Sequence, residues 1–271
     1  MIRTSKINSL FAALLLIFLQ QQSFSQNGGD NTYEFLNLPN SARIASLGGK
    51  FISVYDNDLN LVQQNPALLN SSMNEQFLLN YVNYFSDINF GYISYARDFS
   101  GFGMVSGGMH FIHYGNFQEA DFAGRQYGEF SAAEYAFNLS WAKMLDSTFY
   151  MGISFKPVYS VLEKYHSFGL AFDIGATYLS QDKLFNASLV LKNAGSQIKP
   201  YNPGNYEKLP LEIIAGVSQK LKHAPFRFSL TVQNIEKYDL RYEDPFVVAD
   251  DIDPVTGDTL SGNKTEDFFD N

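Results

Sequence analysis

Hydrophobic and polar residues alternate along most of the chain after residue 76. The pattern is clearest between residues 131 and 179, where three successive runs place a large apolar side chain at every second position. In the first run, for example, Phe137, Leu139 and Trp141 are separated by Asn138 and Ser140. A period of two is the repeat of a β-strand whose two faces differ. The pattern therefore predicts an all-β chain with one bulky apolar face and one small, polar face.

Several of these runs are about 12 residues long, whereas strands of soluble proteins are usually about 5–6 residues. A tilted strand that crosses a bilayer needs ~9–11 residues and turns its bulky face to lipid. The alternative is a soluble sandwich that buries the bulky face between two sheets. The length favours an antiparallel transmembrane β-barrel with nine strands, at residues 77–84, 88–97, 102–114, 132–145, 149–161, 167–179, 185–192, 210–219 and 226–234.

Apart from the first, the connections alternate between short and long, as periplasmic turns and extracellular loops do. The long ones are 115–131, 193–209 and 235–271, which we expect to lie outside and to make partner contacts. Bacterial single-chain barrels have even strand numbers. The odd count predicts that the barrel unit, residues 75–271, is truncated and incomplete at its C-terminus.

Residues 1–25 have the pattern of an export signal. Arg3 and Lys6 precede an apolar run at residues 10–19, and Ser23 and Ser25 provide small residues before the expected cleavage. The apolar run is too short to span a bilayer as a helix. Together with the strands, this signal predicts an outer-membrane location.

Residues 26–74 do not alternate, and they predict a compact hatch or plug before the first strand. The stretch 40–47 is typical of a capped helical turn that ends at Gly48 and Gly49. A second short helix is expected at residues 56–64, ended by Pro66, because proline disfavours helical angles in the residue before it.

Composition narrows the function classes. The 271 residues include no cysteine, which excludes disulfides and thiolate metal sites, and the net charge of −9 disfavours nucleic-acid binding. The mean hydropathy of −0.16 excludes a bundle of transmembrane helices but suits a barrel, since half of each barrel strand is polar.

Several motifs together resemble the PorV/PorQ branch of FadL-like outer-membrane barrels. They are FLNLPNSAR at 35–43, LGG at 47–49, DND at 56–58, NPALL at 65–69, FDIGATY at 172–178, LVLKNAG at 189–195, LPLE at 209–212 and GVS at 216–218. Each is weak alone, but their order and spacing are specific, and they cover most of the chain after the signal.

The resemblance implies a FadL-like barrel of roughly fourteen strands with an N-terminal hatch. It also implies a non-enzymatic role in the type IX secretion system, as an outer-membrane anchor of the cell-surface attachment complex. The implied partners are a PorZ-like surface protein and a PorU/PorV-like attachment complex, beside outer-membrane lipid and lipopolysaccharide. No cofactor is expected.

Candidate site residues form three groups. A structural hatch motif comprises Ala42, Arg43, Gly48, Gly49, Asn65, Pro66 and Ala67. In the lumen we expect Asp173, paired with Lys156 or Arg97. Exposed aromatic residues in the last loop, expected to contact a partner, are Tyr238, Tyr242 and Phe246.

Other chemistries have less support in the sequence. His110 and His113 fall on opposite faces of one strand, which argues against a shared metal, and neither histidine has a nearby serine in a nucleophile-elbow context. The acidic stretch 250–270 does not match the spacing of a calcium-binding loop and is expected to be a solvated surface loop. The alternative function is a FadL-like transporter of hydrophobic small molecules, which the small, polar inward faces disfavour.

Overall fold

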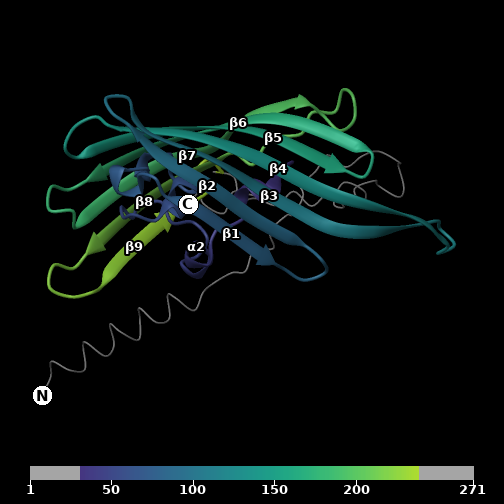
Figure 1. Ribbon diagram of the computed structural model, residues 1–271, viewed down its shortest axis with the longest axis horizontal. Coiled ribbons are helices and arrows are strands. Elements are labelled where there is room, and N and C mark those ends of the chain that lie inside the picture. Colours follow the sequence, from purple (N-terminus) through teal and green to yellow (C-terminus); the bar gives the residue numbers. More distant parts are fainter. Residues whose placement is uncertain (1–30, 238–271) are drawn as a thin grey trace, which may run out of the picture.

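Nine antiparallel strands, paired in chain order, form one sheet (Figure 1). The computed structural model describes residues 31–237. All nine predicted strands are present, and the all-β antiparallel prediction is confirmed. The strands are β1 (Phe77–Asn83), β2 (Asn89–Phe99), β3 (Gly103–Ala120), β4 (Gln126–Met144), β5 (Phe149–Leu162), β6 (Tyr165–Leu179), β7 (Phe185–Lys199), β8 (Glu212–Lys220) and β9 (Arg227–Val232).

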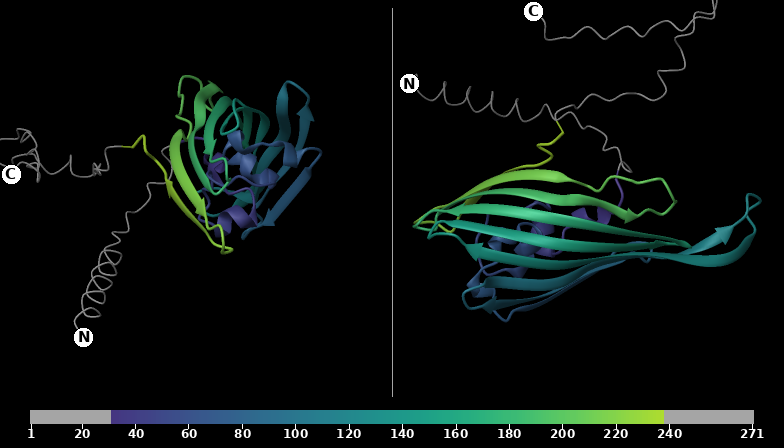
Figure 2. Two further views of the ribbon diagram at one scale, coloured as in Figure 1. Left: turned by 90° about the vertical axis from the view of Figure 1, so that its left-hand side faces the viewer. Right: turned by 90° about the horizontal axis from the view of Figure 1, so that it is seen from above.

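The sheet is strongly curved and forms a trough around the chain that precedes it (Figure 2). Strands β1 and β9 are its two edges and pair only with β2 and β8 within the described residues. The described sheet is therefore open.

The two faces of the sheet differ as the alternation predicts. On β5, Ile153 and Phe155 are exposed on the outer face, whereas Ser154 and Lys156 are buried on the inner face. The same division holds on the other strands, and exposed apolar side chains lie on β1, β2 and β4 to β9. A soluble sandwich would cover this bulky face with a second sheet. In residues 31–237 the bulky face is uncovered, so the sandwich interpretation is wrong for this part of the chain.

Residues 31–76, which we call the N-terminal segment, lie inside the trough (Figure 2). They contain four 3₁₀ turns and one short α-helix. The predicted helix at 56–64 is one of these 3₁₀ turns. The elements are η1 (Glu34–Asn37), α2 (Ala42–Ser46), η2 (Leu59–Gln63), η3 (Pro66–Leu68) and η4 (Ser71–Met73).

Helix α2 begins and ends as its sequence predicts. The side chain of Ser41 accepts a hydrogen bond from the backbone N–H of Ile44, which caps the start of the helix. Gly48 and Gly49 follow with φ of 93° and 80°, a left-handed conformation that favours glycine and ends the helix.

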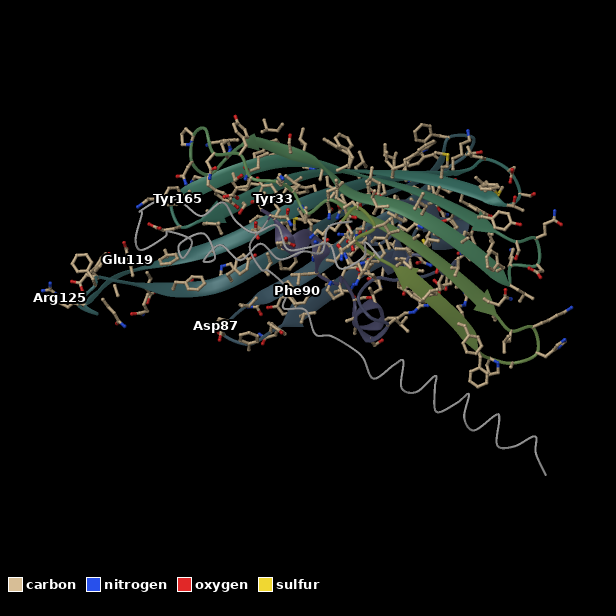
Figure 3. All side chains as sticks on the ribbon, turned by 180° about the vertical axis from the view of Figure 1, so that it is seen from behind. Tyr33, Asp87, Phe90, Glu119, Arg125 and Tyr165 are labelled. Atoms are coloured by element: carbon tan, nitrogen blue, oxygen red, sulfur yellow. The ribbon has the colours of Figure 1, made fainter. Side chains whose placement is uncertain are left out.

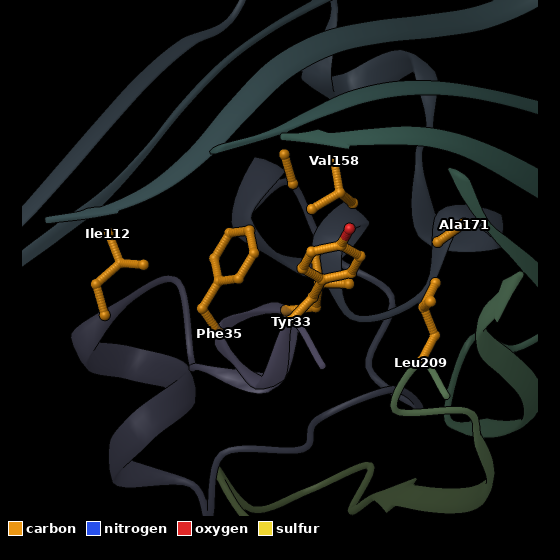
Figure 4. Packing of buried hydrophobic residues seen from close by; sticks show 8 residues of the cluster. Tyr33, Phe35, Ile112, Val158, Ala171 and Leu209 are labelled. Atoms are coloured by element: carbon orange, nitrogen blue, oxygen red, sulfur yellow. The ribbon is translucent and has the colours of Figure 1, made fainter. Parts of the chain in front are cut away.

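Apolar side chains of the N-terminal segment supply the core that the small inner face of the sheet lacks. Tyr33 and Phe35 pack against Val158 and Ala171 of the sheet and against Leu209 (Figure 4). A second cluster joins η2 and η4 to β2, β3 and β4. Full burial of each large side chain contributes roughly 1.5–3 kcal/mol. Within residues 31–237, no helix combines the length and apolarity needed to cross a membrane.

Two of the predicted long loops are partly strand. Strands β3 and β4 continue through the predicted loop 115–131 as far as Ala120 and Gln126, and β7 continues through the predicted loop 193–209 to Lys199. Each extension follows a β-bulge, one between His113 and Asn116 and one opposite Asp173. These bulges place the inner-face residues beyond them out of step with the simple alternation.

Candidate functional site

The candidate site is the polar interface between the N-terminal segment and the inner face of the sheet. Asn65 lies at its centre and is fully buried. Its side-chain oxygen accepts a hydrogen bond from the N–H of Ala67 at 2.9 Å and so caps η3, where Pro66 occupies the first position. Its amide nitrogen donates to the carbonyl of Ile52 at 2.9 Å and to Thr177 Oγ1 at 3.0 Å. One side chain thus ties together the turn, the segment and strand β6.

Two glycines make room for this contact. Gly152 on β5 and Gly175 on β6 are direct cross-strand partners on the inner face. A Cβ added at Gly152 would fall far inside contact distance of the Pro66 carbonyl carbon, and one at Gly175 would do the same with the Asn65 side chain. The backbone of η3 can therefore approach the sheet only where side chains are missing.

Arg43 holds the N-terminal segment together from its exposed side. Its guanidinium contacts Asp56 at 2.5 Å and Asp58 at 2.6 Å. The hydrogen bond with Asp56 is the main cause that raises the pKa of Arg43 above its ordinary value. Ala42 is the exposed first residue of α2. The arrangement is a structural clamp between helix α2 and the stretch that leads into η2.

The structure brings Asp173 and Lys156 together as a buried ion pair. Asn193 bridges them, because its backbone N–H donates to Asp173 Oδ1 at 2.8 Å and its side-chain oxygen accepts from Lys156 Nζ at 3.1 Å. Asn193 has φ of 54° at the bulge, where Lys192 and Asn193 together face Asp173 across the ladder. Its amide nitrogen also donates to Asn37 Oδ1 at 3.3 Å, which links the ion pair to the N-terminal segment.

Arg97 is not part of this interior site, contrary to the sequence prediction. It is exposed, and its guanidinium lies 5.8 Å from the centre of the Phe99 ring. The inner face of β2 is formed instead by Tyr92, Ser94 and Ala96, which are buried. Because residues 92, 94 and 96 face inward, residue 97 faces outward.

Sequence reasoning missed three further charged residues of the interior. Lys50 of the N-terminal segment and Glu212 of β8 form an ion pair at 2.5 Å. Lys192 is buried on the inner face of β7. Parity within the strands could have found Glu212 and Lys192, because each lies an even number of residues from a small inward residue, Gly216 and Ser188 respectively.

Two other buried polar groups face the interior on β3 and β4. His110 is fully buried and packs against Phe35 with ring centres 5.6 Å apart. Glu134 accepts a hydrogen bond from the Tyr114 hydroxyl at 2.5 Å. Among residues 31–237, no three His, Asp or Glu side chains gather in a way that could hold a metal ion.

At the edge of the sheet, an open cavity of about 500 Å³ lies between the N-terminal segment and β9. Its lining is mixed, with Lys50, Phe51, Arg227, Ser229 and Thr231 among the residues that form it. The predicted partner contacts Tyr238, Tyr242 and Phe246 and the predicted signal at 1–25 lie outside the described residues.

Taken together, the arrangement suits mechanical attachment of one segment to a curved sheet. Asn65, Asn193, the Lys156–Asp173 pair and the Lys50–Glu212 pair join the segment to the sheet, and glycines permit close backbone contact. A scan against protein-family models and a search of curated proteins both return no match for this chain.

Proposed function

We propose that this chain is an outer-membrane β-barrel component of the type IX secretion system, a PorQ-like, non-enzymatic anchor for the cell-surface attachment complex. In this proposal the sheet is FadL-like, the outer face meets lipid and the N-terminal segment is the hatch. The observation that carries the proposal is an apolar outer face around an interior that the N-terminal segment fills.

The outer face supports a membrane location. Side chains such as Phe77, Leu139 and Leu230 are more than half exposed, and they belong to strands spread across the whole sheet. Soluble monomers rarely expose contiguous apolar patches larger than a few hundred Å². In a barrel the same face meets hydrocarbon, which removes the cost of exposing it to water.

The lengths of the strands fit the same location. Strands β3 and β4 have 18 and 19 residues. At ~3.3 Å per residue such strands are about 60 Å long, and a tilt of ~45° leaves about 40 Å along the membrane normal. The hydrocarbon core is about 30 Å thick, so these two strands project beyond it.

The interior favours an anchor over a transporter. Asn65, Asn193 and the Lys156–Asp173 pair connect the N-terminal segment to strands β5, β6 and β7. A transporter of hydrophobic molecules needs an apolar lumenal path. Here the inner face of the described sheet is occupied by the segment, through contacts that would have to break before a path opened.

The assignment to type IX secretion is supported by the way separate motifs meet in space. Asn65 of the 65–69 motif binds Thr177 of the 172–178 motif. Asn193 of the 189–195 motif contacts both Asp173 and, through Asn37, the 35–43 motif. Four stretches that resemble one family are thus parts of a single interface, as expected if they specify one hatch-to-barrel joint.

The proposal is tested by tagging the full-length protein, extracting it gently from outer membranes and identifying co-purifying proteins by mass spectrometry. We expect a PorZ-like surface protein and a sortase-like PorU protein, with or without PorV, and we expect their loss when residues 235–271 are deleted. Recovery of the barrel alone with bound fatty acid would overturn the anchor and favour the transporter.

A further inference from the structure

The β3–β4 hairpin extends well past the neighbouring strands at one end of the sheet (Figure 2). Phe117 and Phe130 are cross-strand partners in this extension and stack with ring centres 5.2 Å apart and an interplanar angle of 19°. At the tip, Asp121 accepts hydrogen bonds from the backbone N–H groups of Ala123 and Arg125, both at 2.9 Å. The stacked rings and the turn hydrogen bonds stabilise the projecting hairpin.

An open, apolar pocket of about 390 Å³ lies at the base of this hairpin. We call it the hairpin pocket, and it is lined by Tyr114, Phe117, Phe130, Ala132, Leu162, Glu163 and Tyr165. Ligand pockets have volumes of ~300–1,000 Å³, so a large side chain fits. The pocket joins β3 and β4 to the β5–β6 turn, and Figure 3 shows Tyr165 at the same end of the sheet as Glu119 and Arg125.

Acidic groups surround this apolar lining. Glu163 is part of the lining, and Glu119 lies two residues beyond Phe117 on the same face of the hairpin. Glu134 lies behind Tyr114, whose hydroxyl donates to it. Lys164 lies at the same rim, with its ammonium group 3.3 Å from Glu163 and 5.5 Å from the centre of the Tyr165 ring, and it offsets one of these charges. Because Glu119 and Glu163 outnumber Lys164, the rim favours cations over phosphate groups.

We propose that the hairpin pocket binds a segment of a partner protein in which an aromatic or aliphatic side chain is flanked by Lys or Arg. The apolar side chain fills the pocket while the basic neighbours meet Glu119 and Glu163. An anionic lipid fits poorly, because its phosphate would face these carboxylates. This inference rests on the proposed function for placing the pocket at the cell surface.

Fluorescein-labelled peptides test the pocket on the full-length protein purified in a non-ionic detergent, with binding followed by fluorescence anisotropy. The first peptide is Gly-Ser-Lys-Phe-Lys-Ser-Gly. The second replaces both lysines by Glu, and the third replaces Phe by Ala. We expect the first to bind about tenfold more tightly than either of the others and to weaken as salt is raised.

Matched variants locate the binding on the protein. Phe117→Ala should weaken the first peptide about tenfold, whereas Phe122→Ala, at the fully exposed tip of the same hairpin, should not. Glu119→Lys should weaken it similarly, whereas Glu129→Lys, on the opposite face of the hairpin, should have little effect. The charge variants keep the test valid if Phe117→Ala disturbs the hairpin.

Three results would overturn the inference. The first is equal binding of the acidic and basic peptides, and the second is an equal effect of Glu119→Lys and Glu129→Lys. The third is that a fluorescent phosphatidylglycerol binds, that Phe117→Ala abolishes its binding, and that the basic peptide does not bind. The measurement uses purified protein and does not depend on cellular location. A negative result therefore leaves the outer-membrane proposal to the co-purification experiment.

Discussion

At the residue scale, the attachment of the N-terminal segment depends on the absence of side chains. Gly152 and Gly175 lie opposite each other beneath the Asn65-Pro66-Ala67 turn. Neither glycine is in the left-handed region, so their role is to allow close approach and not to supply backbone freedom. Protein interiors are packed to near crystal density, and the backbone of η3 has no room to retreat here.

We expect Gly175→Ala to destabilise the folded protein by about 1–3 kcal/mol, because its Cβ would overlap Asn65. The thermal midpoint in detergent can be followed by the fluorescence of the single tryptophan, Trp141. Gly107→Ala is the matched control, since a Cβ at that position meets nothing within 4 Å. Equal effects of the two changes would contradict the close packing of the turn.

The buried ion pair leads to a second prediction at this scale. Lys156→Met leaves Asp173 buried without its cation, and we expect a loss of about 3–5 kcal/mol of stability. The double variant Lys156→Met/Asp173→Leu should recover part of that loss, because neither member of the pair is then left unpaired, although the buried Lys192 loses the neighbouring carboxylate. Urea unfolding of the refolded variants measures the change in the free energy of unfolding for the single and for the double variant.

Lys164→Met is the control for this pair, since it breaks only the exposed contact with Glu163 and should leave stability almost unchanged. If Lys156→Met cost no more than Lys164→Met, the Lys156–Asp173 pair would not be desolvated as the structure has it.

At the scale of elements, period-two alternation was sufficient to predict all nine strands but not their full lengths. The pattern failed beyond two β-bulges. After the bulge at Gly115, with φ of 86°, the inward positions change from Ile112 and Tyr114 to Phe117 and Glu119. A single sequence does not reveal such a shift, because a bulge adds one residue to one strand only.

The interior site was predictable where one face of a strand is uniformly small. Lys156 and Asp173 lie among Gly, Ala and Ser, and parity placed them correctly. Strand β2 instead has aromatic residues on both faces, with Tyr92 buried inside and Tyr95 exposed outside. The sequence of β2 therefore does not show which of its residues face inward, and this explains why Arg97 was predicted on the wrong face.

The tip of the β3–β4 hairpin leads to a prediction about pH. The backbone N–H of Arg125 is the main cause that lowers the pKa of Asp121, with further lowering by Ala123 N–H and the Arg125 side chain. Because the folded-state pKa lies below the unfolded value of ~3.9, the carboxylate supports the turn fully above about pH 4. This stabilisation of the turn is lost as the pH falls through the lowered pKa of Asp121.

A spin label at Phe122→Cys tests this directly, since the natural chain has no cysteine. Label mobility should stay constant from about pH 8 to pH 5 and rise below about pH 4. With Asp121→Asn the mobility should not depend on pH, because the amide oxygen accepts the same backbone bonds and does not titrate. A pH-dependent rise that persists in Asp121→Asn would show that another group is responsible.

At the scale of the whole molecule, we propose that the bulky outer face of the curved sheet meets lipid, while the N-terminal segment fills the inner face. The side chains of β5 offer the sharpest contrast, because Ile153 and Phe155 point outward and Ser154, between them, is buried inside. Single cysteines at these positions can carry spin labels in the otherwise cysteine-free chain.

The most direct measurement is the accessibility of these labels to oxygen, which concentrates in lipid, and to a water-soluble nickel complex, after reconstitution into bilayer vesicles. We expect high oxygen and low nickel accessibility at Ile153→Cys and Phe155→Cys, low accessibility to both at Ser154→Cys, and high nickel accessibility at Phe122→Cys on the projecting tip. Nickel accessibility at residues 153 and 155 equal to that at residue 122 would contradict this proposal.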